Sequence, residues 1–124
     1  MDEARRALVF AGDIPQGGQA RLMRGHPQRL IDGAAAAVQA ALGQGQVSQD
    51  QPMLMLSVSC VGRRLVLGGN TEEELESIAA RLPPGSGHVG FYAYGEISPA
   101  ADRETRLHNQ TLTVTVMVED ETAT

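Results

Sequence analysis

Cys60 is the only thiol in the chain, and it opens the run Cys60-Val61-Gly62-Arg63-Arg64. The run follows a strand pattern, so we predict a loop at the end of a central strand, where ligands commonly bind in α/β sheets. Gly62 permits a tight turn there, and the guanidinium of Arg63 is suited to bind a carboxylate. Cys60, Gly62 and Arg63 are therefore candidate ligand-binding residues. The alternatives are a small buried apolar role for Cys60 and a solvated side chain for Arg63.

Nucleophilic catalysis by Cys60 needs a nearby base, and the chain has three histidines for that role, His26, His88 and His108. Their spacing singles none of them out, and it contains no zinc-binding pattern. We therefore expect neither an enzyme nor a metal site. A haem needs only one axial histidine, so His108 or His88 is the candidate ligand in an alternative haem-binding hypothesis.

Tyr92, Tyr94 and Glu96 recur at every second position, so one strand is predicted to project all three from the same face. Two hydroxyls and a carboxylate in a row can line a polar pocket. The alternative is a solvent-facing strand, because tyrosine has a high strand propensity. Gly90 and Gly95 bracket the row, and glycines within a strand often mark a bulge or a close backbone approach.

The elements that must position these residues can be predicted from hydrophobic periodicity and turn residues. An apolar run that ends in turn residues predicts a strand at 6–13, and alternation of side chains predicts strands at 19–24, 53–60, 88–96 and 109–119. Helical spacing predicts a helix at 27–42. A second helix is expected from Thr71, where Thr71 and Glu74 fit a capping box, to Leu82, just before Pro83-Pro84-Gly85. Residues 98–107 are predicted to be a loop.

This order, β-β-α-β-α-β-β, predicts an α+β fold in which two helices pack on a mixed, mostly antiparallel sheet. Hairpin-like links join the strands at both ends of the chain, and helical crossovers lie in the middle. With 124 residues, one core is sufficient, and we expect a single domain over residues 1–124.

The composition of the chain argues against nucleic acid as a partner and against a membrane-spanning segment. Ten arginines against 15 acidic residues give a net charge of −5, and the arginines are scattered, so nucleic acid is not an expected partner. No stretch approaches the roughly 18 apolar residues of a membrane-spanning helix. The acidic start, Met1-Asp2-Glu3, is unlike a secretory signal, and we expect a cytoplasmic location.

Three blocks of the sequence together resemble a known family. They are Ser59-Cys60-Val61-Gly62-Arg63-Arg64, Gly90-Phe91-Tyr92-Ala93-Tyr94-Gly95-Glu96-Ile97 and Leu107-His108-Asn109-Gln110-Thr111-Leu112-Thr113. The chain resembles the C-terminal part of the FIST domain over about residues 6–119. His108 and Asn109, in the third block, join the candidate ligand-binding residues.

The resemblance implies an intracellular sensory module of a signal-transduction protein. Modules of this family are coupled to histidine kinases, cyclic-dinucleotide enzymes or chemoreceptors, and are proposed to bind small ligands such as amino acids. Some members are haem proteins that sense nitric oxide. The usual N-terminal FIST half and an output domain are not recognised in this sequence, so both are expected partners.

We therefore expect a small ligand, such as an amino acid, to be held by Arg63, Tyr94, Glu96 and Asn109. Arginine suits the carboxylate of an amino acid, and glutamate suits its ammonium group. A haem-binding module is the second hypothesis. A non-catalytic interaction domain, with homodimerisation through a sheet or hairpin edge, is the third.

Overall fold

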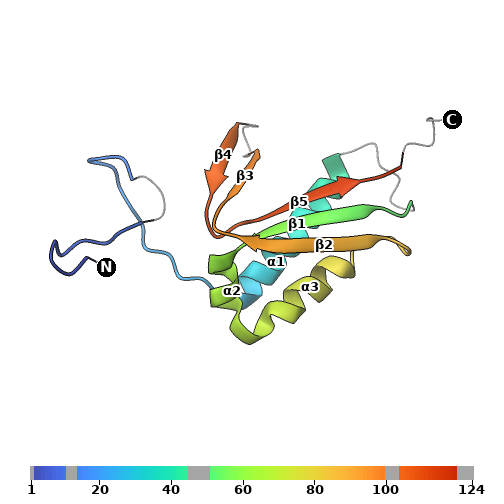
Figure 1. Cartoon of the computed structure of the whole chain (residues 1–124), viewed down its shortest axis with the longest axis horizontal. Helices are drawn as coiled ribbons and strands as arrows, with labels where there is room; N and C mark the ends of the chain where they lie inside the picture. Colours follow the sequence, from blue (N-terminus) through green and yellow to red (C-terminus); the bar gives the residue numbers. More distant parts are fainter. Residues whose placement is uncertain (1, 11–13, 45–50, 100–103, 120–124) are drawn as a thin grey trace.

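The computed structural model describes residues 2–10, 14–44, 51–99 and 104–119 (Figure 1). Its elements in chain order are α1 (Pro27–Gln44), β1 (Leu54–Cys60), α2 (Val61–Leu67), η1 (Gly68–Asn70), α3 (Thr71–Ala79), β2 (Gly87–Ala93), β3 (Glu96–Pro99), β4 (Thr105–His108) and β5 (Leu112–Met117). The predicted α+β class is confirmed, with helices packed on a mixed sheet.

A three-stranded sheet in the order β2-β1-β5 forms the centre of the structure. β1 runs parallel to β2 and antiparallel to β5, which confirms that the 53–60 segment is a central strand. β3 and β4 form a separate two-stranded antiparallel ribbon that stands at one end of the sheet (Figure 1).

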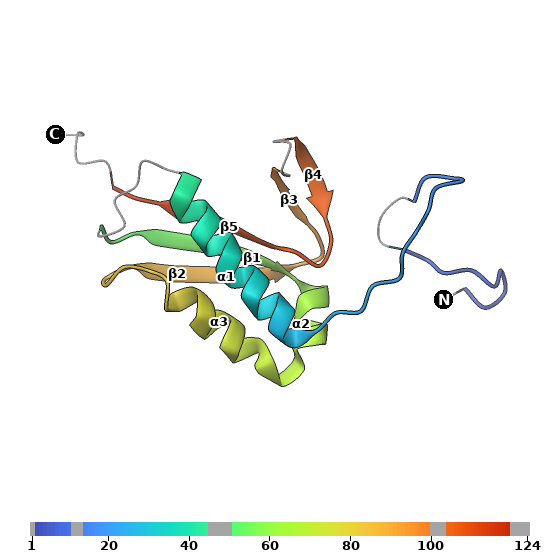
Figure 2. The ribbon, with the colours of Figure 1, turned by 180° about the vertical axis from the view of Figure 1, so that it is seen from behind.

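α1 and α3 lie on the same side of the three-stranded sheet, as both ribbon views show (Figures 1 and 2). The core beneath them is formed by Ala34, Val38, Met55 and Ile78, all fully buried. Alternation along β1 places Met55, Ser57 and Ser59 on this helix-covered side, so two serines share the buried face with a methionine. Leu54, Leu56 and Val58 lie on the opposite side.

The predicted N-terminal hairpin is wrong within the described residues. Residues 6–10 and 19–24 form no strand, and the backbone pairing described there is one isolated bridge between Asp2 and Ala7. Residues 11–13 lie outside the described part of the chain. Residues 7–10 are all apolar and residues 19–24 alternate, but a two-stranded hairpin alone is marginally stable and needs a face or a third strand on which to pack.

The loop predicted after Cys60 is also wrong, because Val61–Leu67 is a helix. Arg63 and Leu67 are four residues apart, lie on one side of this helix and are both buried. Local sequence favoured a loop because Gly62 weakens a helix by about 1 kcal/mol. The burial of Arg63 and Leu67 against the rest of the fold outweighs that cost.

The capping box predicted at Thr71 and Glu74 is absent. Thr71 is itself helical, and its Oγ1 donates a hydrogen bond of 2.9 Å to the carbonyl oxygen of Gly68. α2, η1 and α3 follow one another directly, so α3 does not begin at an isolated cap. The helix ends at Ala79, three residues before the predicted Leu82.

The predicted strand 88–96 is divided in two, and part of the predicted loop 98–107 is a strand. β2 ends at Ala93, β3 begins at Glu96, and β4 spans Thr105–His108. Residues 100–103 lie outside the described residues. The row of Tyr92, Tyr94 and Glu96 is consequently broken, because its members lie on β2, on the connection that follows it and on β3.

Candidate functional site

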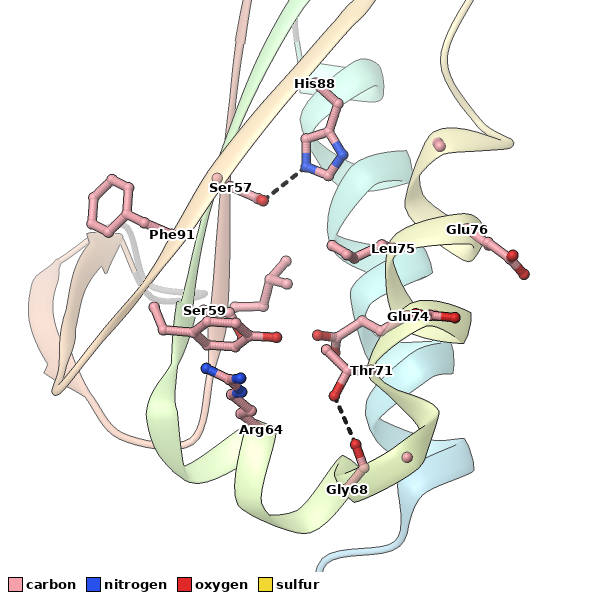
Figure 3. Close-up of a pocket in the computed structure, with 16 residues that line it drawn as sticks. Ser57, Ser59, Arg64, Gly68, Thr71, Glu74, Leu75, Glu76, His88 and Phe91 are labelled. Atoms are coloured by element: carbon pink, nitrogen blue, oxygen red, sulfur yellow. Dashed lines mark hydrogen bonds between the residues drawn. The ribbon is translucent and has the colours of Figure 1, made fainter.

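An open cleft of about 930 Å³ separates β1 and β2 from α3 (Figure 3). α1 packs against α3 and β5. The surface of β1 and β2 that faces α3 carries the small residues Ser57, Ser59 and Gly90. Because these side chains are too short to reach the helix, the space remains open. The cleft is lined by Ser57, Ser59, Arg64, Gly68, Gly69, Thr71, Glu72, Glu74, Leu75, Glu76, Ala79, His88, Gly90, Phe91, Tyr92 and Leu112.

Ser57 and His88 are joined across the parallel strand pair. Ser57 Oγ lies 2.9 Å from His88 Nε2, and Figure 3 shows this bond at one end of the cleft. Burial lowers the pKa of His88, because the charged imidazolium loses solvation. At neutral pH the imidazole is therefore uncharged, so the serine hydroxyl donates to Nε2 when the ring proton is on Nδ1 and accepts from Nε2 when the proton is there.

Gly90 is the register partner of Ser57 on β2, and only glycine fits there. A Cβ atom at position 90 would lie 2.7 Å from the carbonyl oxygen of Ser57 and even closer to its Oγ. Because Gly90 has no side chain, the Ser57 side chain has room to lie against β2 and to reach His88.

Ser59 supplies an unused polar group in the same wall. The residue is 7% exposed, and its Oγ has no hydrogen-bond partner in the described structure. A buried hydroxyl without a partner costs free energy of about 1–3 kcal/mol, so such groups are uncommon unless something else satisfies them. A ligand in the cleft is one group that would do so.

Arg64 provides a cation at the other end of the cleft. Its guanidinium carbon lies 5.3 Å from the centre of the Tyr92 ring, within the range of a cation–π contact. The contact fixes an exposed arginine beside the strands, and Figure 3 shows the side chain at the end of the cleft away from His88. His88 and Arg64 thus mark the two ends, with Ser59 between them.

Arg63 has a different role from its neighbour. It is buried and forms an ion pair with Glu74 of α3, while its Nη2 also donates a hydrogen bond of 2.9 Å to the carbonyl oxygen of Leu30 in α1. This arginine connects three helices. Its partner Glu74 is 1% exposed and belongs to the α3 wall of the cleft.

Four other predicted site residues gather at the base of the β3–β4 ribbon, outside the cleft lining. Cys60 is buried, and its backbone N–H donates to the carbonyl oxygen of Thr111. Glu96 is buried and accepts a hydrogen bond of 2.7 Å from Thr111 Oγ1. His108 is the register partner of Glu96, and a Cβ at Gly62 would approach Cys60 Sγ to 3.6 Å.

The remaining predicted residues do not converge. Tyr92 lines the cleft, but Tyr94 is 89% exposed and Asn109 is exposed in the connection before β5. Arg63, Tyr94, Glu96 and Asn109 therefore do not form one pocket in this structure, because the break after Ala93 and helix α2 send them in different directions.

Sequence reasoning did not select Ser57, Ser59 and Arg64 as site residues, and it considered His88 only as a candidate base or haem ligand; these four residues define the cleft. One signal was available. The 53–60 strand carries two serines on the same face as two methionines, and polar residues on a face that is otherwise apolar often mark a site. Within the described residues, no group of three or more His, Cys, Asp or Glu side chains is arranged to hold a metal ion.

Comparison with protein families gives one match. The sequence model of the FIST C domain matches residues 1–99, which is more than half of the chain. The chain belongs to the FIST C domain family. The resemblance found in the sequence is thereby confirmed, and FIST membership implies a sensory domain in signal transduction. Neither the curated proteins nor the solved structures contain a match.

The FIST match covers both β1 and β2, and so includes every strand residue of the cleft except Leu112. Among the described residues of this FIST domain, no helix has the length and apolar character needed to cross a membrane.

Proposed function

We propose that this FIST domain is an intracellular sensory module that binds a small polar ligand in the cleft between β1, β2 and α3. The observation that carries the proposal is the buried, unpartnered hydroxyl of Ser59 in the cleft wall. Arg64 and His88 lie on either side of it, so a ligand there meets a cation, a free hydroxyl and a neutral imidazole. Ligand occupancy is then passed to an output domain, such as a histidine kinase, a cyclic-dinucleotide enzyme or a chemoreceptor.

An amino acid fits these groups. Its carboxylate is suited to Arg64, which faces water and can form two parallel hydrogen bonds. Its ammonium group is suited to the carboxylate of Glu72, which is exposed and belongs to the α3 wall. This arrangement replaces the set expected from the sequence, because Arg63 already has Glu74 as its partner and Glu96 lies at the base of the ribbon.

We propose binding without catalysis. The Ser57–His88 pair resembles a nucleophile and its base, but Ser57 is buried in the middle of β1. β1 is paired with β2 on one edge and β5 on the other, so the ladders use its backbone N–H groups rather than leaving them for an oxyanion. Cys60 lies outside the cleft lining, and Cys60→Ala is expected to leave ligand affinity unchanged.

Haem is a less suitable ligand for this cleft. A haem needs an axial histidine and a largely apolar enclosure, whereas His88 has its Nε2 bonded to Ser57 and the wall contains serines and glutamates. His108 Nε2 lies 3.1 Å from the carbonyl oxygen of Ser98 on the ribbon. A Soret band after haem reconstitution that disappears in His88→Ala or His108→Ala would support the haem alternative over ours.

Isothermal titration of the full chain with a panel of amino acids tests the proposal. We expect at least one member to bind, and Arg64→Gln to weaken it about tenfold or more through loss of the charged hydrogen bonds. The matched control is Arg29→Gln, an exposed arginine of α1 that is not part of the cleft. No heat with any member contradicts the amino acid, and equal effects of the two variants contradict the cleft.

A further inference from the structure

The side of the three-stranded sheet that faces away from α1 and α3 is apolar and uncovered. The register places Leu54, Leu56 and Val58 of β1, Val89 and Phe91 of β2, and Met117 of β5 on this side, together with the polar Thr113 and Thr115 of β5. Phe91 is 58% exposed and Val89 is 53% exposed. None of the residues that these three strands place here is charged. We call this surface the open face.

A contiguous apolar surface of this kind usually marks an interaction site, because exposure of large apolar side chains to water is unfavourable. β2 also forms an edge of the sheet, and its sequence has no proline or lysine that would discourage association. Figure 3 shows the Phe91 ring on the side of β2 away from α3, although Phe91 also borders the cleft, so the open face adjoins the ligand site.

The N-terminal arm, residues 2–10 and 14–24, is the second uncovered apolar element. It extends away from the sheet in both ribbon views (Figures 1 and 2). Leu8, Val9, Phe10, Leu22 and Met23 are all exposed, with 76% for Val9 and 87% for Leu22. The hydrogen bonds described for the arm join its own residues to one another, as between Asp2 and Ala7 or Gly18 and Pro15.

The arm leaves the body at a crowded point. A Cβ atom at Gly25 would lie 2.9 Å from Val66 Cγ1, so the backbone passes directly over α2 at this glycine. The arm then runs out beyond the end of the sheet at which α2 lies (Figures 1 and 2).

Charge distinguishes the arm from the body. Residues 1–26 contain four arginines and three acidic residues, a net charge of +1, whereas residues 27–124 contain six arginines and twelve acidic residues, a net charge of −6. An arm is therefore attracted to the body of another copy, although the whole chains repel each other with −5 each.

We propose that two copies of this chain exchange arms, with the apolar arm of each copy packed on the open face of the other. Each contact between an arm and an open face covers both apolar surfaces, and a two-fold axis relates the two equivalent contacts of the dimer. The partner is a second copy because the same chain carries the apolar arm, the apolar face and the opposite charges of the two.

Analytical ultracentrifugation of the full chain over a range of concentrations tests the exchange. We expect a dimer. An arm variant, Leu8→Glu with Phe10→Glu, and a face variant, Val89→Lys, should each raise the dimer dissociation constant about tenfold or more, because a charge replaces a buried apolar side chain. The control is Leu65→Lys, which changes an exposed leucine of α2 that is not part of the open face and should have no effect.

Mixing the two variants separates arm exchange from a dimer of face against face. The arm variant retains an intact face and the face variant an intact arm, so a labelled sample of one should associate with the other better than either does with itself. A monomer at every concentration overturns the proposal, even if hydrogen exchange shows the arm protected on its own face. A dimer that the arm variant leaves unchanged also overturns it.

Discussion

The carboxylate of Glu74 on α3 and the guanidinium of Arg63 on α2 form an ion pair that is almost completely removed from water. Eleven positions separate the two residues in the sequence, and a second hydrogen bond ties Arg63 to the backbone of Leu30. The pair therefore sets the position of α3 relative to α2 and α1. Because α3 is one wall of the cleft, the width of the cleft depends on this contact.

Glu74→Gln is expected to lower the free energy of unfolding by about 3–5 kcal/mol, because it leaves the charge of Arg63 buried without a counterion. Urea unfolding followed by circular dichroism measures the loss. The control is Glu73→Gln, whose exposed side chain can keep its hydrogen bond from Asn70. If both variants lose the same small amount, the pair has no structural role.

Arg63→Met combined with Glu74→Leu should recover most of the stability lost in Glu74→Gln, since two apolar side chains in contact bury no charge. The same unfolding measurement compares the double variant with each single one. A double variant as unstable as the sum of its single changes would show that the two side chains act independently.

Gly90→Ala should destabilise the domain by about 1–3 kcal/mol, because the added methyl group overlaps the Ser57 side chain and backbone. Gly33→Ala is the matched control. Gly33 is exposed within α1 and has open space around it, so alanine there should stabilise by about 0.5–1 kcal/mol through helix propensity. Thermal unfolding of both variants checks the opposite signs, and a neutral Gly90→Ala would contradict the close approach.

His88 should make the domain less stable in mild acid. Burial lowers the pKa of His88 in the folded state, so below about pH 6.5 the unfolded chain binds the proton more readily. The contribution of neutral His88 to the free energy of unfolding is therefore complete above that pH and declines as the pH falls toward the folded-state pKa. Unfolding of the wild type and of His88→Gln at several pH values should show a smaller acid-side loss for the variant; identical pH profiles would exclude a role for His88.

Thr111→Val should cost about 1–3 kcal/mol, because it removes the hydrogen bond to the buried carboxylate of Glu96. Glu96 Oε1 has no partner in the described structure, so the bond from Thr111 to Oε2 is the main interaction that offsets the cost of burying this carboxylate. Thr115→Val is the control, since Thr115 is exposed on β5 and valine suits a strand. Equal stability of the two variants would mean that solvent, rather than Thr111, compensates Glu96.

The sequence alone established the elements with a strong local period. The helix from Pro27, the central strand that ends at Cys60 and the α+β class all followed from side-chain spacing, which reports directly on the buried side of an element. The family could also be identified from short blocks of sequence, because that identification depends on which residues occur together and not on where they lie in the fold.

Only the tertiary structure decided which residues meet. Arg63 and Arg64 are adjacent in sequence and identical in type, yet one is buried against Glu74 and the other lies at the cleft beside Tyr92. The difference arises because α2 turns successive side chains by about 100°, and a helix was not expected there. Likewise, Tyr92 and Glu96 separate because β2 ends between them. Contacts between distant segments fix such outcomes, and local periodicity contains no record of them.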